Sequence, residues 1–254
     1  MKARLVLIVK FVLLGSFFSV IVQAQTKKRN KQTIKITFNN KVNQQHVILD
    51  SAQYINYLNE TFTINKLKYY ISNIGLQKPG TRNFIEKNSS HLINEEDSAS
   101  KTFSFLISSD NYESISFLIG VDSIKNVSGA QADALDPLNG MFWTWNTGYI
   151  MFKMEGNSEQ SSLVNKKIEY HIGGFAGTNN VLRSVKLNFK EDPIILKKHR
   201  SAEIIIEFDL NKIWNVNNKL SIKQTPVCTT PGVMAANIAN NYAAAFQIIN
   251  VINH

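Results

Sequence analysis

Two tryptophans two residues apart form the part of the sequence with the most chemical potential. Trp143 and Trp145 stand beside Met141 in the segment 140–149. If this segment is extended, all three side chains project from one face, because side chains alternate along a strand. Three interpretations stay open: packing in a core, a flat aromatic platform for a glycan or another protein, and redox or metal chemistry.

A metal site would have to be assembled by folding, because the five histidines are far apart in the sequence. His171 ends a predicted strand before Gly173-Gly174, where the backbone can approach another group closely. Imidazole nitrogen suits copper, and thioether sulfur favours Cu(I). The candidate ligands, in order, are His171, His91 and His46, with Met141 as a soft ligand. The ordinary alternative for His171 and His91 is a histidine that bonds a backbone carbonyl.

Acidic residues offer two further roles. A ligand histidine needs its second nitrogen held by a carboxylate or a carbonyl, and the candidates are Asp122, Asp136 and Glu169. The segment 120–140 is polar and aperiodic, and a loop of this length is usually functional, so we expect it to be ordered and to form a wall of the site. Its oxygens could instead bind calcium, through Asp122, Asn126, Asp133 and Asp136. Their spacing does not match an EF-hand, and such residues often bond backbone turns.

Familiar catalytic motifs are missing from the sequence. It contains no Gly-x-Ser-x-Gly elbow, no phosphate-binding Gly-x-x-x-x-Gly-Lys and no His-Glu-x-x-His. Cys228 is the one cysteine, so an intramolecular disulfide is excluded, and we expect the thiol to be buried rather than reactive. The sequence therefore predicts a protein that is not an enzyme.

The N-terminus predicts export. Residues 1–24 read as a signal peptide, with basic residues, an apolar run and a small-residue cleavage site at Ala24. Residues 25–32 form a basic, flexible stub, and residues 33–254 a single domain. Removal of the signal peptide takes away Lys2, Arg4 and Lys10 and no acid, so the net charge falls from +9 to +6. This scattered surplus does not favour nucleic-acid binding. We expect a periplasmic or secreted bacterial protein without stable membrane insertion.

The strands that must position these residues are predicted from alternation of apolar and polar side chains. The runs with this pattern are 34–38, 67–74, 114–119, 149–154, 168–172, 181–189 and 204–208. They predict a mainly β fold, an antiparallel β-sandwich with long ordered loops. A C-terminal helix is predicted from about 232 to 249, with Thr230 as the cap and Pro231 suited to the first helical position. Its apolar stripe consists of Met234, Ile238, Tyr242, Ala245 and Ile249.

Several segments together resemble the MbnP-like copper-binding family of bacterial exported proteins. They are Phe62-Thr63 and residues 67–74, 115–123, 126–130, 134–137, 139–150, 155–156, 170–175, 226–232 and 238–242. The resemblance implies copper binding and a partner, the diheme peroxidase-like protein MbnH, which oxidises a tryptophan to kynurenine. Trp143 and Trp145 are the candidates for that modification. The segment lacks a histidine beside them, which departs from a local Trp-x-His site.

The resulting hypothesis is an exported copper-binding protein that acts in copper acquisition, storage or handling, with redox chemistry supplied by the heme partner. The alternative is a metal-free extracellular binding or adhesion module. It would use Trp143, Trp145 and Tyr149 as an aromatic platform for a glycan or a protein.

Overall fold

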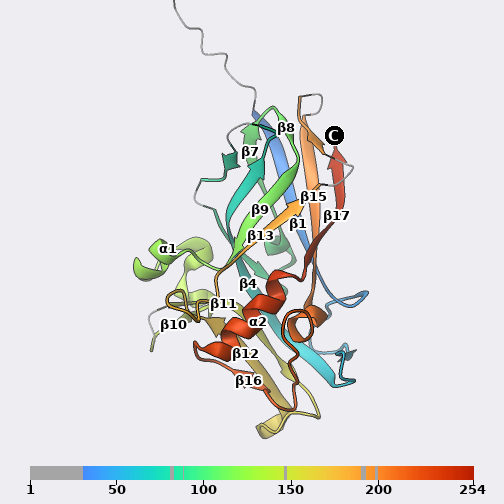
Figure 1. The fold of residues 1–254 in the computed structure, drawn as a ribbon, viewed down its shortest axis with the longest axis vertical. Coiled ribbons are helices and arrows are strands. Elements are labelled where there is room, and N and C mark those ends of the chain that lie inside the picture. Colours follow the sequence, from blue (N-terminus) through green and yellow to red (C-terminus); the bar gives the residue numbers. More distant parts are fainter. Residues whose placement is uncertain (1–30, 81–82, 88, 146–147, 190–192, 198–199) are drawn as a thin grey trace, which may run out of the picture.

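A computed structural model describes residues 31–80, 83–87, 89–145, 148–189, 193–197 and 200–254 of the chain (Figure 1). The predicted signal peptide, residues 25–30 of the stub and His199 lie outside the described residues. The described part is mainly β, as predicted, and its strands form two larger sheets and a small one. None of its helices is long and apolar enough to cross a membrane.

The first sheet has five strands in the order β17-β15-β1-β2, with β7 also paired to β1. Its strands are β1 (Lys31–Val42), β2 (Gln45–His46), β7 (Thr102–Ser108), β15 (Ser201–Asp209) and β17 (Phe246–Asn253). β1 and β15 run parallel, which departs from the predicted antiparallel pairing. A parallel pair needs a long crossover, and most strands of the second sheet lie between these two strands in the sequence.

The second sheet is built along one long strand, β4 (Thr61–Gln77), in the order β13-β9-β4-β11-β12-β16. Its other strands are β3 (Tyr54–Ile55), β5 (Phe84–Ile85), β6 (Ser90–Asn94), β9 (Ser114–Ile119), β10 (Phe142–Trp143), β11 (Gly148–Asn157), β12 (Lys167–Gly173), β13 (Arg183–Asn188) and β16 (Val227–Cys228). β11 and β9 follow one another along one edge of β4, while β3, β6 and β5 line the other edge. A separate pair joins β8 (Asn111–Tyr112) to β14 (Ile194–Ile195).

Aromatic side chains fill the space between the two larger sheets. Phe208 and Phe246 of the first sheet stack with their ring centroids 4.4 Å apart. Tyr69 of β4 packs edge-on against Phe208 at 5.2 Å, and Phe152 of β11 does so at 6.1 Å. Because side chains alternate, the residues of β4, β11 and β12 between these inward-facing ones project from the outer face of the second sheet.

The C-terminal helix is shorter than predicted. α2 begins at Val233 and ends at Ala243, and Gly232, rather than Thr230, is its N-cap. The predicted continuation through Ala245 to Ile249 is wrong: the chain turns there and becomes β17, which pairs with β15. The segment from Phe246 onward is rich in β-branched and aromatic residues, and pairing with a buried strand overrides the helical spacing.

Short helices occupy the segment 120–140 above the outer face of the second sheet. They are α1 (Ser123–Val127) and the 3₁₀ turns η2 (Asp133–Leu135) and η3 (Pro137–Asn139); η1 (Ser98–Lys101), η4 (Val164–Lys166) and η5 (Leu210–Trp214) lie elsewhere. Tyr149 of β11 anchors this segment to the sheet through two hydrogen bonds. Its backbone N–H donates to Asn126 Oδ1 at 3.1 Å and its hydroxyl donates to the Leu135 carbonyl at 2.8 Å. The expectation that the segment is ordered is confirmed.

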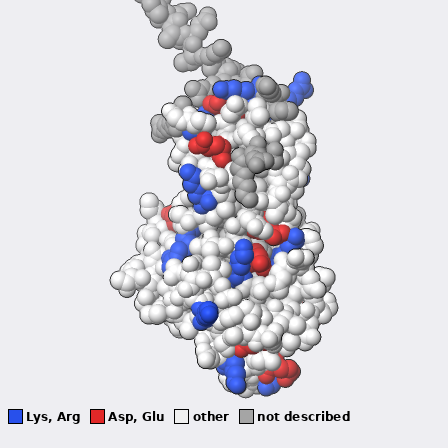
Figure 2. All heavy atoms as spheres, turned by 45° about the vertical axis from the view of Figure 1, so that its right-hand side comes forward, with Lys and Arg blue, Asp and Glu red and all other residues white. Residues whose placement is uncertain are grey.

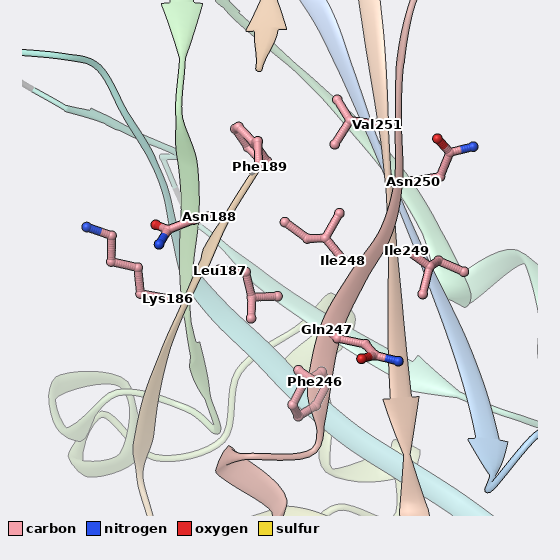
Figure 3. A pocket seen from close by; sticks show the side chains of 10 residues that line it. All are labelled: Lys186, Leu187, Asn188, Phe189, Phe246, Gln247, Ile248, Ile249, Asn250 and Val251. Carbon is pink, nitrogen blue, oxygen red and sulfur yellow. The ribbon is translucent and has the colours of Figure 1, made fainter. Parts of the chain in front are cut away.

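The sandwich is open along one side, between β13 and β17, where a groove of about 510 Å³ lies (Figure 3). Leu187 and Ile248 project into it from opposite strands, whereas Lys186 points away. On the face shown in Figure 2, acidic and basic side chains gather in small groups separated by uncharged surface.

Candidate metal centre

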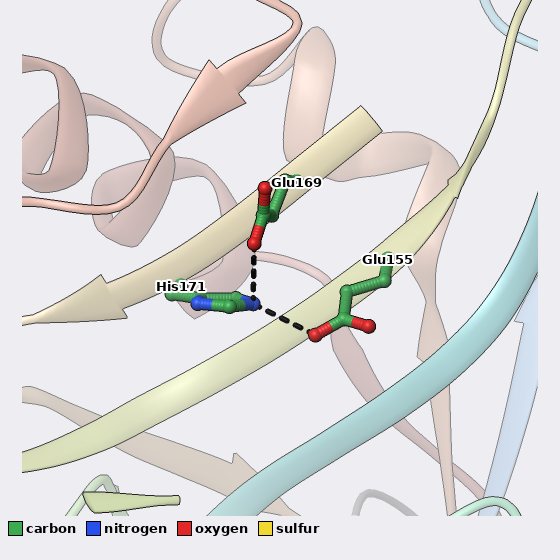
Figure 4. A group of neighbouring side chains, drawn as sticks. All are labelled: Glu155, Glu169 and His171. Atoms are coloured by element: carbon green, nitrogen blue, oxygen red, sulfur yellow. Dashed lines mark hydrogen bonds and ion pairs between the residues drawn. The ribbon is translucent and has the colours of Figure 1, made fainter. Parts of the chain in front are cut away.

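Three ligand-type side chains meet on the outer face of the second sheet (Figure 4). His171 Nε2 lies 2.8 Å from Glu155 Oε1 and 3.6 Å from Glu169 Oε1. Within the described residues, this is the one group of three His, Cys, Asp or Glu side chains whose ligand atoms all lie within 4.8 Å of one another. Metal bonds of about 2.0–2.2 Å at angles of about 90–110° separate ligand atoms by roughly 2.8–3.6 Å, so the distances from His171 Nε2 to the two carboxylates fit a metal ion.

Strand register brings the three residues together. Glu155 of β11 pairs with Glu169 of β12, and Lys153 pairs with His171. Directly paired residues point to the same face, with Cβ atoms about 4.5–5.5 Å apart. The carboxylates therefore come from one cross-strand row, and the imidazole comes from the next row on the same face.

Each of the two cross-strand rows continues onto β4 with a lysine. Lys66 pairs with Glu155, and Lys68 pairs with Lys153. Lys66 Nζ lies 3.4 Å from Glu155 Oε2. Lys153 is only 9% exposed, and its ammonium group donates a hydrogen bond to the Gly140 carbonyl. Burial lowers the pKa of Lys153, an effect that the neighbouring Glu155 opposes.

Glu155 is held as a carboxylate. Its hydrogen bond with His171 is the largest influence and lowers its pKa to about 2, against the opposing effect of burial. Lys66 and Lys153 lower the pKa further through their charges. The outer face thus offers an ionised oxygen ligand next to an imidazole nitrogen.

The two tryptophans lie beside this cluster but differ in environment. Trp143 is 6% exposed and Trp145 is 63% exposed, with their ring centroids 5.2 Å apart. Both line a surface hollow of about 470 Å³ together with Glu169, His171, Thr229 and Thr230. The segment is extended only at β10, and Trp145 stands in the turn that follows. The predicted single face of three side chains therefore does not extend to Trp145.

Trp143 reaches the cluster because Gly173 leaves room for its ring. A Cβ on Gly173 would lie 2.5 Å from Cζ3 of Trp143. On the other side, Trp143 borders a hollow of about 550 Å³ that Asn126, Val127 and Gly129 also line. The predicted close approach at Gly173-Gly174 is confirmed, and the segment 120–140 contributes a wall beside Trp143.

His91 lies in a different place from His171. His91 pairs with Ile71 of β4, whereas Lys68 of β4 lies in the same cross-strand row as His171. Ile71 and Lys68 are three positions apart, and residues an odd number of positions apart on a strand point to opposite faces of the sheet, so His91 and His171 lie on opposite faces. Its Nε2 lies 3.1 Å from both oxygens of Glu86, and its ring stacks on Phe103 at 3.6 Å. The structure therefore does not bring His91 and His171 together.

The other predicted ligands also lie apart from the cluster. His46 is exposed on β2 of the first sheet, where it pairs with Lys41. Met141 is fully buried and does not line the hollow that holds His171. His171 is the one predicted ligand found in the cluster.

The acidic residues divide between two roles. Glu169, predicted to support His171, lies next to it in the cluster. Asp122 and Asp136 instead cap helices, because their carboxylates accept from the backbone N–H groups of Lys125 and Leu138. Asp133 begins η2, and Asn126 donates to the Val121 carbonyl. Asp122 and Asp136 therefore do not hold the His171 ring, whose carboxylate neighbours are Glu155 and Glu169.

Glu155 is the site residue that sequence reasoning missed. It lies two residues after Lys153 in a strand whose other side chains are apolar from Tyr149 to Met154. The signal in the sequence was the pair Lys153 and Glu155, two charged residues at alternate positions of an otherwise apolar strand. The pairing with β12 that selects Glu155 was not visible in the sequence.

Comparisons with known proteins agree with this architecture. The model of the MbnP family matches residues 31–234. Among solved structures, MbnP from Methylosinus trichosporium is similar, with a TM-score of 0.52 and 14% sequence identity over 72% of this chain and 78% of that one. At this identity the likeness concerns the fold. No curated protein matched the sequence.

Proposed function

Because the chain belongs to the MbnP family, we propose that it is an exported copper-binding protein that acts in copper acquisition, storage or handling. The observation that carries the proposal is the Glu155–Glu169–His171 cluster beside two tryptophans. Its donors are one imidazole nitrogen and carboxylate oxygens. Among common divalent ions, Cu²⁺ generally binds such sites most tightly. Calcium, the alternative considered for the oxygens of the segment 120–140, would gain nothing from the imidazole of this cluster.

The tryptophans support a second part of the proposal, the oxidation of one indole to kynurenine by a diheme partner. Cleavage of the indole C2–C3 double bond is a four-electron oxidation that inserts two oxygen atoms, supplied by two equivalents of peroxide that the heme partner reduces to water. Hydrolysis of the resulting N-formyl amide by water then releases formate and leaves kynurenine. Trp145 is exposed and Trp143 touches it, which suits removal of electrons from the pair at the surface. The product would carry an aniline nitrogen and a carbonyl oxygen close to the cluster.

The partner surface in this proposal lies around the tryptophan pair, on the side of the hollow that Trp143 borders. Val127 is 71% exposed at the hollow on one side of Trp143, and Phe175 and Pro231 line the same hollow. Exposed apolar side chains around a site favour contact with another protein.

Copper titration of the exported form tests the metal site. We expect one Cu²⁺ per chain, detected by calorimetry and by quenching of tryptophan fluorescence. His171→Ala should weaken binding by more than the roughly 10–100-fold that loss of an outer-shell partner costs. His91→Ala is the matched control and should keep wild-type affinity. Unchanged binding in His171→Ala would refute the site.

The same titration separates the alternative module from the copper protein. A metal-free aromatic platform predicts no stoichiometric copper binding in any variant. The mass of Trp143- and Trp145-containing peptides from the native host tests the oxidation. An unmodified mass there would contradict the kynurenine proposal and leave the copper site standing.

A further inference from the structure

We propose that Lys153, assisted by Lys66, sets the oxidation-state preference of the metal centre by cancelling the charge of its two carboxylates. The inference rests on the proposed copper site. It concerns residues that bind no metal themselves but lie in the same two cross-strand rows as the ligands.

The positions of the two ammonium groups are fixed by contacts. Lys66 Nζ lies 3.4 Å from Glu155 Oε2, on the far side of that residue from β12. Lys153 pairs with His171, and its hydrogen bond to the Gly140 carbonyl keeps its charge in place. Because Lys153 is buried, solvent ions screen its charge less than that of an exposed lysine.

The charges of the surrounding groups decide how the site treats Cu⁺ and Cu²⁺. Glu155 and Glu169 contribute two negative charges, and Lys66 and Lys153 contribute two positive ones. Coulomb energy is proportional to the charge of the ion, so an ammonium group opposes Cu²⁺ twice as strongly as Cu⁺. The lysines therefore bring the affinities for the two oxidation states closer together than carboxylates alone would allow.

A purely structural role for Lys153 makes the opposite prediction. The bond to Gly140 also ties the tryptophan segment to β11. If Lys153 served only as this tie, its loss would loosen the site and weaken the binding of every ion. The electrostatic role predicts that loss of the charge strengthens the binding of a dication.

The experiment compares wild type with Lys153→Met, which removes the charge, and Lys153→Arg, which keeps it. Lys68→Met is the matched control, because Lys68 is next in the row and already pairs with Glu96 at 3.0 Å. We expect Lys153→Met to lower the Cu²⁺/Cu⁺ midpoint potential and to raise Zn²⁺ affinity roughly tenfold or more. Lys153→Arg and Lys68→Met should stay near wild type in both measurements.

Two outcomes would overturn the inference. If copper and zinc bind but Lys153→Met weakens zinc or leaves the potential unchanged, the electrostatic role is wrong and the copper site remains. If neither metal binds to wild type or to any variant, the proposed function and the inference fall together. Circular dichroism of each variant verifies that its fold is intact.

Discussion

The indole ring of Trp143 lies directly against Gly173, two residues after His171 on the same strand. Residues two apart on a strand share a face, so this contact places the buried tryptophan next to the imidazole. A side chain at position 173 would occupy the space of the ring. The closeness of tryptophan and candidate ligand therefore depends on a glycine.

Gly173→Ala should displace Trp143. The added Cβ would lie 2.5 Å from the ring, so we expect a loss of about 1–3 kcal/mol in the free energy of unfolding, the usual range for overpacking. Chemical denaturation measures this loss. In a double-mutant cycle, the cost of Gly173→Ala should be much smaller in the Trp143→Val background, because the ring that the added Cβ would clash with is gone. Additive effects of the two substitutions would contradict the contact.

Trp145 should account for the fluorescence that a soluble quencher can reach. It is 63% exposed, while Trp143 and Trp214 are buried. We expect Trp145→Phe to remove nearly all of the acrylamide-quenchable emission, and Trp143→Phe to leave that fraction in place. Equal quenching in the two variants would mean that Trp143 is as accessible as Trp145.

Glu60 should link stability to pH. Its buried carboxylate accepts hydrogen bonds from Ser221 Oγ at 2.6 Å, Asn56 Nδ2 at 2.6 Å and the backbone N–H groups of Ile222 and Lys223 at 2.8 and 3.0 Å. Burial alone would raise its pKa, but these bonds outweigh burial and lower the pKa below its ordinary value of 4.5. The stabilisation is therefore complete above pH 4.5 and is lost as the pH falls through the lowered pKa.

Glu60→Gln removes that charge. We expect a loss of at least about 1.5–3 kcal/mol in unfolding free energy at neutral pH, and a smaller difference from wild type in acid. Urea denaturation at several pH values measures both. Glu159→Gln, at an exposed position, serves as control and should change little. If the difference in unfolding free energy between wild type and Glu60→Gln stays constant as the pH falls, Glu60 does not link stability to pH.

Cys228 should react slowly in the folded protein. The thiol is buried on β16, and burial raises its pKa to about 11. At pH 8 only about one thiol in a thousand would be a thiolate, the reactive form. We expect little modification by a disulfide reagent in buffer and complete modification in denaturant. Rapid reaction of the native protein would show that the thiol is accessible.

Local alternation predicted most of the fold. The strands that hold the site, β11 and β12, were expected because apolar and polar residues alternate in 149–154 and 168–172. Pairing between strands was not predictable in the same way. Glu155 joins His171 only through the register of β11 and β12, and His91 is excluded only through its register on β4. These contacts connect residues far apart in the sequence, where a local pattern carries no information.

Phe246→Ala tests the part of the fold that sequence analysis assigned wrongly. The predicted helix would place Ile249, and not Phe246, in its apolar stripe. In β17, Phe246 instead stacks on Phe208 and also packs on Tyr69 and Phe117. We therefore expect Phe246→Ala to cost about 3–5 kcal/mol of unfolding free energy, as for a large core aromatic.

Ile249→Ala is the matched comparison, because both residues lie in the same strand and both are apolar. Ile249 stands at the irregularity in the β15–β17 pairing and is 45% exposed, so its truncation should cost about 1 kcal/mol or less. Denaturant unfolding of both variants measures the difference. A helix continuing to Ile249 would reverse the order, since Ile249 would then pack on the sandwich and Phe246 would leave the stripe. The larger loss in Phe246→Ala is therefore the result that a C-terminal strand requires.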